Sequence, residues 1–305
     1  MKSTLLSALC ILAGLALLSG WTDTDDRAAI TSQARVSTAQ LPQQIRAITL
    51  KDDYSLGGER LPMEKQDVRE RLDRELSVNS YWHSSTLLNM KLATRHFATI
   101  EPILAEYGVP DDFKYLAVAE SNLRNVTSHA GAKGYWQFLK TTARAYDLEI
   151  NSEVDERMHI EKSTHAAAKY LRDLHKKFGS WTLAAAAYNG GETRIRRLLK
   201  EQRADNYYEL NMADETMRYV FRIVAIKEIL SSPETFGFSL DQGYQYDTPQ
   251  DLYILEVAES ITNWGDYAKQ YGSDYRTLKY YNPWLISAQL TVSEGNSYLV
   301  RLPKK

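Results

Sequence analysis

The sequence predicts a mainly helical protein that ends in a small β-α-α-β module. Apolar residues recur at the spacing of one helix face in successive segments from about residue 63 to residue 230, and no strand pattern interrupts them. After Pro233 the pattern changes, and two short strand-like runs flank two short helical segments. These two observations divide the chain into a large helical domain and a small mixed domain.

The helical domain is expected to cover residues 63–230. Its first helix contains Val68, Leu72 and Leu76, which recur at i, i+4 and i+8 and therefore share one face. Four alanines at 184–187 allow another helix to approach closely. Further helices are expected over residues 86–107, 162–178, 181–188 and 215–230.

The C-terminal module is expected over residues 249–305, after a linker at 231–248. Its β-α-α-β order follows from alternating strand-forming and helical runs. The strands are expected at 252–257 and 297–302, and the helices at 266–271 and 274–281.

The composition excludes one class of function and favours another. The 39 acidic and 37 basic residues leave a formal net charge of −2, which argues against a nucleic-acid-binding protein. The chain has 20 Tyr and 6 Trp, and aromatic rings can stack on the C–H faces of sugars. Many of these aromatic residues are equally expected to be core residues.

The N-terminus resembles a secretory signal peptide over residues 1–20. Lys2 gives it a positive start, residues 5–18 form its apolar region, and small residues follow at Ser19 and Gly20. The stretch is short for a membrane span, although an uncleaved anchor is the alternative. We therefore expect an exported protein of the periplasm or cell envelope.

Residues near the predicted cleavage site indicate a soluble mature chain rather than a lipoprotein. Trp21 stands where a lipoprotein would carry its lipidated cysteine. The only cysteine, Cys10, lies inside the signal peptide, so the mature chain has no thiol for a disulfide or a nucleophile. Residues 21–62 are polar and are expected to form a linker or a loosely packed arm.

One carboxylate lies on the apolar face of a predicted helix. The helix follows Pro110 and carries Phe113, Leu116 and Ala117 at i, i+3 and i+4. Position i+7 of the same face is Glu120. Burial raises the pKa of a glutamate and keeps it protonated near neutral pH, as a general acid requires. The alternative is a carboxylate at the helix end that reaches solvent.

Three further motifs follow in order along the chain. Gly131 and Gly134 make a tight turn before the aromatic-rich run 134–138, in which Gln137 can both donate and accept hydrogen bonds. Residues 187–191 read Ala-Tyr-Asn-Gly-Gly, where two glycines allow a close approach. Glu215 begins the last helix of the domain.

These motifs together resemble the lytic murein transglycosylases with a goose-type lysozyme-like (SLT) catalytic domain, most closely the membrane-bound transglycosylase D subgroup. The resemblance implies a lysozyme-like fold and makes Glu120 the catalytic acid and base. It rests on the runs 120–121, 131–138, 187–191 and 215–220. The substrate contacts that it implies are Ser128, Trp136, Gln137, Tyr188, Asn189, Glu215 and Tyr219.

The C-terminal module resembles a degenerate LysM module, a family that binds glycans containing N-acetylglucosamine. The resemblance implies peripheral association with the cell wall, and the alternative is a structural appendage. The matching residues are Ala268, Tyr271, Gly272, Leu278, Asn282, Pro283, Leu290, Gly295, Leu299 and Pro303.

The resemblance also implies the chemistry. Glu120 protonates the MurNAc–GlcNAc β-1,4 glycosidic oxygen and then deprotonates the C6 hydroxyl, which gives 1,6-anhydroMurNAc ends. The six histidines show no metal-ligand spacing, so we expect neither a metal nor a cofactor. Two alternatives stay open: a hydrolytic lysozyme- or chitinase-type glycosidase, and a catalytically silent peptidoglycan-binding protein.

Overall fold

The computed structural model describes residues 46–241 and 243–304. The predicted signal peptide at 1–20 and residues 21–45 of the predicted arm lie outside the described residues. Among the described residues, no helix is long and apolar enough to cross a membrane.

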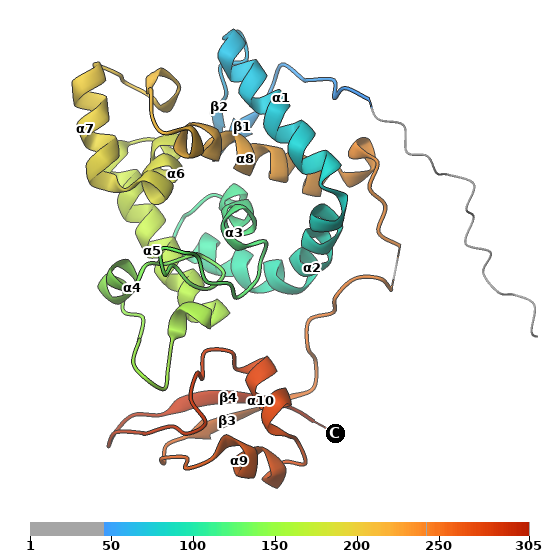
Figure 1. Cartoon of the computed structure of the whole chain (residues 1–305), viewed down its shortest axis with the longest axis vertical. Coiled ribbons are helices and arrows are strands. Elements are labelled where there is room, and N and C mark those ends of the chain that lie inside the picture. Colours follow the sequence, from blue (N-terminus) through green and yellow to red (C-terminus); the bar gives the residue numbers. More distant parts are fainter. Residues whose placement is uncertain (1–45, 242, 305) are drawn as a thin grey trace, which may run out of the picture. The chain divides into compact units, whose positions relative to one another are not determined.

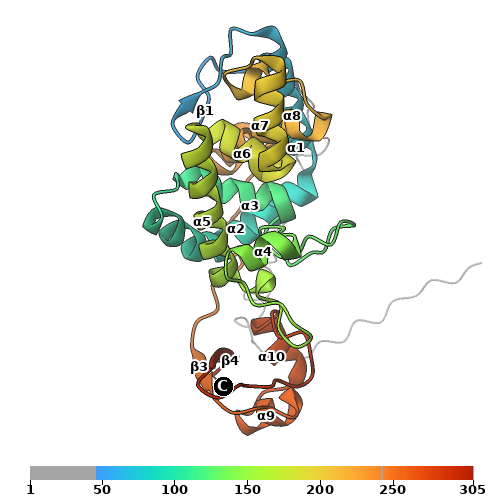
Figure 2. The same cartoon turned by 90° about the vertical axis from the view of Figure 1, so that its left-hand side faces the viewer.

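Five helices form a closed ring around a short central one, α3 (Lys114–Ser121) (Figure 1). Each helix of the ring packs on the next: α1 on α2, α2 on α5, α5 on α6, α6 on α8, and α8 on α1. Helix α3 packs on α8 and α2, and it lies near the centre in both views (Figures 1 and 2). The ring helices are α1 (Gln66–Tyr81), α2 (His83–Glu106), α5 (Ile160–Phe178), α6 (Trp181–Gly190) and α8 (Asp214–Ser231).

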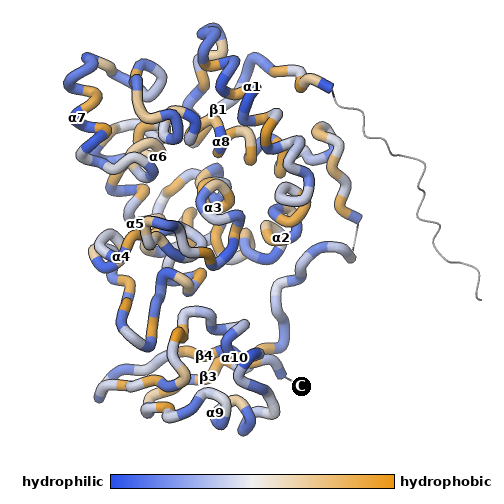
Figure 3. The backbone as a smooth tube through the Cα atoms, viewed as in Figure 1, coloured by the Kyte–Doolittle hydropathy of each residue, from blue (hydrophilic) through white to orange (hydrophobic). Residues whose placement is uncertain are grey.

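Smaller elements connect these helices. In Figure 3 the tube of α7 alternates between hydrophilic and hydrophobic colour, and Ile195 is its buried residue. The sequence patterns did not indicate α4, α7 or the β1–β2 hairpin. The connecting elements are β1 (Ser55–Leu56), β2 (Glu59–Arg60), η1 (Asp111–Phe113), α4 (Lys140–Ala145), η2 (Glu156–Met158), α7 (Glu192–Gln202), η3 (Tyr207–Glu209) and η4 (Pro233–Phe236).

The core of the helical part depends on small side chains as well as large ones. Ala184–Ala187 of α6 are completely buried, as expected for helices that approach closely. Gly190 continues this close approach, since a side chain there would lie about 3 Å from Thr216 of α8. Helix α3 buries Leu116, Ala117 and Val118 against this core.

The end of the predicted arm is not loosely packed. Tyr54, Leu56 and Leu61 are buried in the core of the helical part, where the β1–β2 hairpin holds them. Glu59 of the hairpin accepts hydrogen bonds from the backbone of Trp181 and Thr182, the first residues of α6. A carboxylate at a helix N-terminus satisfies free N–H groups and complements the helix dipole. The other domain boundaries stay predictions.

The C-terminal module has the predicted β-α-α-β order. Its strands β3 (Leu252–Val257) and β4 (Tyr298–Pro303) pair antiparallel, with Leu252 opposite Pro303. Two short helices, α9 (Trp264–Gln270) and α10 (Tyr275–Tyr281), pack against each other between the strands in sequence. Trp264, Leu278 and Val300 are completely buried in the module's own core.

One segment of the helical part, residues 149–158, joins two regions. Val154 is completely buried in the core of the C-terminal module, and Asp155 N–H donates to Trp284 O over 2.9 Å. Arg157 is buried in the same segment and donates to the carbonyl groups of Gly131 and Phe138. The segment therefore holds the 131–138 turn on one side and the module on the other.

The packing behind Gly134 predicts a large effect of a single methyl group. Gly134 has a φ of +82°, and a Cβ atom there would lie 1.8 Å from Arg157 O. Because backbone would have to move, Gly134→Ala is expected to lower the free energy of unfolding by about 3 kcal/mol or more. Gly131→Ala is the matched control. Its φ is +79° and its Cβ would meet nothing, so we expect a loss of about 1 kcal/mol. Equal losses in urea denaturation would contradict this account.

Candidate active site

Glu120 lies in the last turn of α3 and is partly exposed. The helix ends at Asn122, which adopts the left-handed conformation with a φ of 53° and donates its N–H to Val118 O. Asn89 of α2 donates to the Asn122 side chain over 3.0 Å. These contacts fix the end of α3 and with it the direction of the Glu120 side chain.

The surroundings of Glu120 favour its protonated form. Burial raises its pKa to about 7, while the hydrogen bond from the Tyr219 hydroxyl group and the nearby charge of Arg222 lower it. The negative charge of Glu215 raises it again. A carboxyl group with a pKa near 7 can both give and take a proton at neutral pH, which general acid–base catalysis requires.

Two hydrogen bonds attach the aromatic-rich 134–138 run to the helices around Glu120. The Ser121 hydroxyl donates to Tyr135 O over 2.7 Å, and the Tyr188 hydroxyl donates to Trp136 O over the same distance. Tyr188 comes from α6 and is near enough to Glu120 for the carboxylate charge to raise its pKa, although burial raises it more. Residues from α3, α6 and α8 therefore meet at this place.

Gln137 and Ser128 both hold the loop in which they lie. Gln137 has a φ of 49°, and its amide nitrogen donates to Gly134 O and Val126 O. Its donors are therefore used within the loop, while its side-chain oxygen is the remaining acceptor. Ser128 is exposed, and its hydroxyl oxygen accepts from Ala132 N–H over 3.1 Å, which closes the turn.

Two of the expected substrate contacts are buried side chains. The Trp136 side chain is completely buried and its Nε1–H donates to Thr164 Oγ1, so it is a core residue rather than a surface for a sugar. Tyr219 is also buried, with 1% of its surface exposed, and its hydroxyl group contacts Glu120. Aromatic residues are mistaken for ligand contacts because their large apolar area suits a core equally well.

Asn189 and Glu215 lie near the start of α8. Asn189 accepts a hydrogen bond from the Thr216 hydroxyl over 3.0 Å. Glu215 is paired with Arg222 at 2.7 Å and with Arg218 at 3.3 Å, and the hydrogen bond from Arg222 lowers its pKa. The pKa values of Glu120 and Glu215 are thus moved apart, a pattern typical of sites that use one acid and one permanent anion.

Sequence patterns did not indicate roles for Ser121, Arg222 and Glu75. Arg222 follows Tyr219 by three residues and Glu215 by seven, so helical spacing alone places all three on one face. Glu75 follows Leu72 by three residues and Val68 by seven, the same pattern that identified Glu120.

Among the described residues, neither a cluster of metal-binding side chains nor the cavity between α2 and the end of α8 involves Glu120. Within residues 46–241 and 243–304, no three His, Asp or Glu side chains cluster so that they could hold a metal ion. A cavity of about 550 Å³ lies between α2, α3, the end of α8 and residues 233–245, and none of the predicted site residues lines it.

Because the pKa of Glu120 is raised in the folded protein, replacing its carboxyl group with an amide is expected to increase the free energy of unfolding at high pH. Since the folded-state pKa is about 7 against an ordinary 4.5, the unfolded chain loses this proton first as the pH rises. The free energy of unfolding therefore falls between these two values. Glu120→Gln loses no proton, so we expect it to be more stable than the native protein by about 2–3 kcal/mol at pH 8. Near pH 4 the two should be equal.

Urea denaturation at pH 4, 6 and 8 measures this difference, and Glu215→Gln is the control of opposite sign. Its pKa is lowered in the fold, so the native carboxylate stabilises the protein above the ordinary pKa. Glu215→Gln should therefore be less stable than the native protein at pH 8. A Glu120→Gln protein that gains nothing between pH 4 and pH 8 would contradict the raised pKa.

Comparison with known proteins places this site in a known kind of domain. Residues 99–211 match the transglycosylase SLT domain, and residues 253–305 match the soluble lytic transglycosylase C-terminal LysM-like domain. The first match contains Glu120 and the 131–138 and 187–191 motifs, while Glu75 and α8 lie outside it.

Individual relatives agree with these matches. The membrane-bound lytic murein transglycosylase D of Escherichia coli is 29% identical over 289 residues, which are 92% of this chain and 61% of the relative. The peptidoglycan transglycosylase gp16 of Escherichia phage T7 is 34% identical over 114 residues, or 36% of this chain and 9% of that protein.

A solved structure of an inactive mutant of the lytic transglycosylase Slt from Pseudomonas aeruginosa is 25% identical. The match covers 50% of this chain and 26% of the chain in that structure, with a TM-score of 0.39. This chain spans 61% of the length of the E. coli transglycosylase D. Two stretches of this chain are therefore similar to known domains, residues 99–211 to the transglycosylase SLT domain and residues 253–305 to the LysM-like C-terminal domain of soluble lytic transglycosylases.

Proposed function

We propose that this chain is a peptidoglycan lytic transglycosylase that cleaves the MurNAc–GlcNAc β-1,4 bond without water and leaves 1,6-anhydroMurNAc ends. One observation carries the proposal. The carboxyl group of Glu120 has a pKa of about 7, receives a hydrogen bond from Tyr219, and lies within the residues that match an SLT domain.

In the first half of the reaction Glu120 acts as the acid. Its proton goes to the glycosidic oxygen while the bond from that oxygen to C1 of MurNAc breaks. The 2-acetamido oxygen of the same sugar attacks C1, as in substrate-assisted glycosidases. The Tyr219 hydroxyl group stabilises the carboxylate that results, because a hydrogen bond to the charged form favours it.

In the second half the same carboxylate acts as the base. It takes the proton of the C6 hydroxyl group, and O6 attacks C1 and displaces the acetamido oxygen. The proton that Glu120 gave is thereby restored, and no water enters the products. One group with a pKa near 7 serves both steps, which a carboxyl group with an ordinary pKa would do poorly at neutral pH.

Other residues are proposed to bind the sugar. Gln137 and Tyr188, whose hydroxyl group donates to the Gln137 loop at Trp136 O, orient the reacting MurNAc. Asn189 and Glu215 contact hydroxyl groups, and Ser128 contacts the N-acetyl region. Glu215 stays ionised beside Arg222 and so does not act as a second acid.

The decisive variant is Glu120→Gln, which keeps the size of the side chain but cannot transfer the proton. Release of soluble muropeptides from purified peptidoglycan should fall on the order of 10²–10⁴-fold, at the upper end because one group serves both steps. Mass spectrometry of the native protein's products should find 1,6-anhydro ends. Glu106→Gln, an exposed carboxylate on α2, is the matched control and should keep native activity.

Each outcome of this experiment has one meaning. Near-native turnover by folded Glu120→Gln protein would overturn the assignment of the acid. Native products that end only in reducing sugars would make the protein a hydrolase with Glu120 as its acid. Absence of any released muropeptide with the native protein would favour a peptidoglycan-binding protein without catalysis.

We further propose that the protein acts outside the cytoplasm, in the periplasm or cell envelope, after removal of residues 1–20. Its substrate is the peptidoglycan of that compartment, and both relatives are named for transglycosylase activity on murein or peptidoglycan.

The C-terminal module is proposed to bind the glycan strand through aromatic residues. The Tyr253 and Tyr271 rings lie 6.0 Å apart, and Tyr271 and Tyr267 lie 5.3 Å apart, which makes a row of three rings. Tyr253 is 40% exposed at one end of this row. Such a row can stack on successive sugars.

A double substitution tests this surface without removing the module, since its removal would expose Val154. Tyr253→Ala with Tyr271→Ala should weaken sedimentation with peptidoglycan sacculi about tenfold or more, the effect of losing about 1.4 kcal/mol. Ile254→Ala is the matched control, because Ile254 is 64% exposed and faces the other side of the same strand. Unchanged binding of the double variant would reduce the module to a structural role.

A further inference from the structure

A second carboxylate is buried among apolar residues on a helix face. Glu75 of α1 follows Val68 and Leu72 on the face that packs against α8, and only 3% of its side chain is exposed. Its position lies outside the residues that match the SLT domain. A buried carboxylate without partners would be strongly unfavourable, so its partners explain why the position holds a charge.

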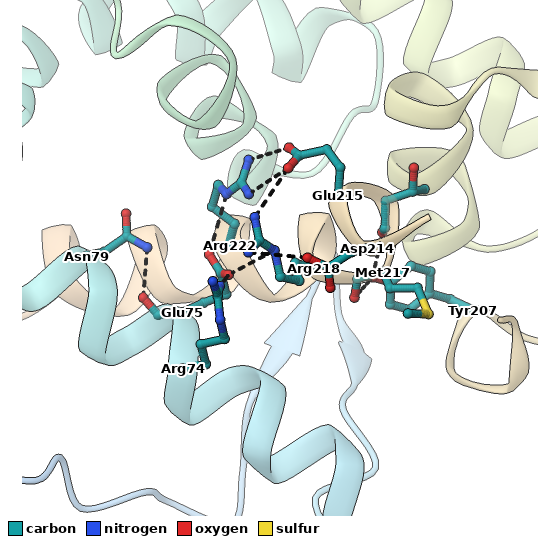
Figure 4. A network of polar contacts seen from close by, with 10 residues as sticks. Arg74, Glu75, Asn79, Tyr207, Asp214, Glu215, Met217, Arg218 and Arg222 are labelled. Carbon is teal, nitrogen blue, oxygen red and sulfur yellow. Dashed lines mark hydrogen bonds and ion pairs between the residues drawn. The ribbon is translucent and has the colours of Figure 1, made fainter. Parts of the chain in front are cut away.

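Glu75 is paired with Arg74, its neighbour on α1, and with two arginines of α8, and these two also hold Glu215 (Figure 4). Arg222 lies 3.4 Å from Glu75 through Nε and 2.7 Å from Glu215 through a terminal nitrogen. Arg218 lies 3.5 Å from Glu75 and 3.3 Å from Glu215 in the same way. Each guanidinium group is therefore placed between two carboxylates, one buried and one 54% exposed.

Stability alone gives no reason for this arrangement. Buried ion pairs are often replaced by apolar residues without loss of stability, because removing the charges from water offsets their attraction. Arg222 and Arg218 expose about a fifth of their side chains, and Glu75 almost nothing. What the pairs do provide is a fixed direction for each planar guanidinium group.

The network carries charge into the neighbourhood of Glu120. Arg222 follows Tyr219 by one helical turn, and Tyr219 contacts Glu120 directly. The positive charge of Arg222 favours the ionised form of Glu120, and the negative charge of Glu215 favours the protonated form. Glu75 adds a negative charge behind Arg222 and also keeps Arg222 turned toward Glu215.

The charged and titratable groups that act on Glu120 come from two helices. Helix α8 presents Tyr219, Arg222 and Glu215 to Glu120, and α6 presents Tyr188. At the opposite end of α3, Lys114 is paired with Glu101 of α2 and Asp111 of η1, so these groups hold one another there.

We propose that Glu75 is a positioning residue of the active site, which holds Arg222 and Arg218 against Glu215 and so preserves the protonated, acid form of Glu120 at neutral pH. The proposal rests on the proposed function, in which Glu120 is the acid. It assigns a role to α1, a helix that contributes no group to the reaction itself.

The pH dependence of muropeptide release tests the proposed positioning role of Glu75. The alkaline limb of the rate profile reports the loss of the acid's proton. Glu75→Gln removes a negative charge, so this limb should move to lower pH by about half a unit, less than a charge in direct contact would cause. Arg222→Gln should move it to higher pH, and the double variant should return close to the native limb. Glu75→Asp, which keeps the charge, should stay near the native limb.

Arg74→Gln is the matched control. Arg74 contacts the Glu75 carboxylate over 2.7 Å, but its own side chain is 50% exposed. The substitution should leave the limb unmoved, since solvent screens an exposed charge. A folded Glu75→Gln protein whose rate falls equally at every pH, with its alkaline limb in place, would overturn the proposal. If Glu75→Gln does not fold, the same comparison is made between Arg222→Gln and the charge-balanced double variant.

A second measurement separates this inference from the proposed function. Carbon NMR of labelled glutamate side chains follows the titration of Glu120 directly, with Glu120→Gln identifying the resonance. A lower titration midpoint in Glu75→Gln supports the positioning role even if the native protein releases no muropeptides. A native protein that is active but whose Glu120 midpoint does not respond to Glu75→Gln contradicts the positioning role alone.

Discussion

The desolvated carboxyl group of Glu120 is the constraint on which the rest of the helical part depends. It lies at the end of a helix whose other inward residues are completely buried, and burial outweighs the effects of Tyr219 and Arg222 on its pKa. A single ionisable group in such a place destabilises the folded protein above its ordinary pKa. The closed ring of helices around α3 supplies the apolar contacts that offset this effect.

Polar contacts around Glu120 keep it both desolvated and accessible. Ser121 and Tyr188 attach the backbone of the 134–138 run to α3 and α6, and the Gln137 side chain holds the loop from within. On the opposite side, α8 carries a hydroxyl group to Glu120 and two guanidinium groups toward Glu75. The site is therefore preorganised by residues that mostly do not touch the substrate, as catalysis by fixed groups requires.

The parts of the fold and of the candidate site that the sequence predicts are those whose contacts join residues close together along the chain. Local spacing predicted the five ring helices, the order of elements in the C-terminal module and the place of Glu120 on an apolar helix face, because each of these patterns spans only a few turns. Trp136 was misassigned because an aromatic-rich run looks the same in a core and at a surface. Glu75 shows the same local pattern as Glu120, but the two α8 arginines that pair with it lie more than 140 residues away, and no pattern within α1 indicates them.

The segment 149–158 gives the two parts of the chain a common support. Arg157 donates to the carbonyl groups of the 131–138 turn, and Gly134 packs directly against the Arg157 backbone. Val154, three residues earlier, is completely buried in the core of the C-terminal module. The same short segment therefore packs against the turn near Glu120 and against the core of the C-terminal module. The described residues from Ala47 onward, the module included, form one compact unit.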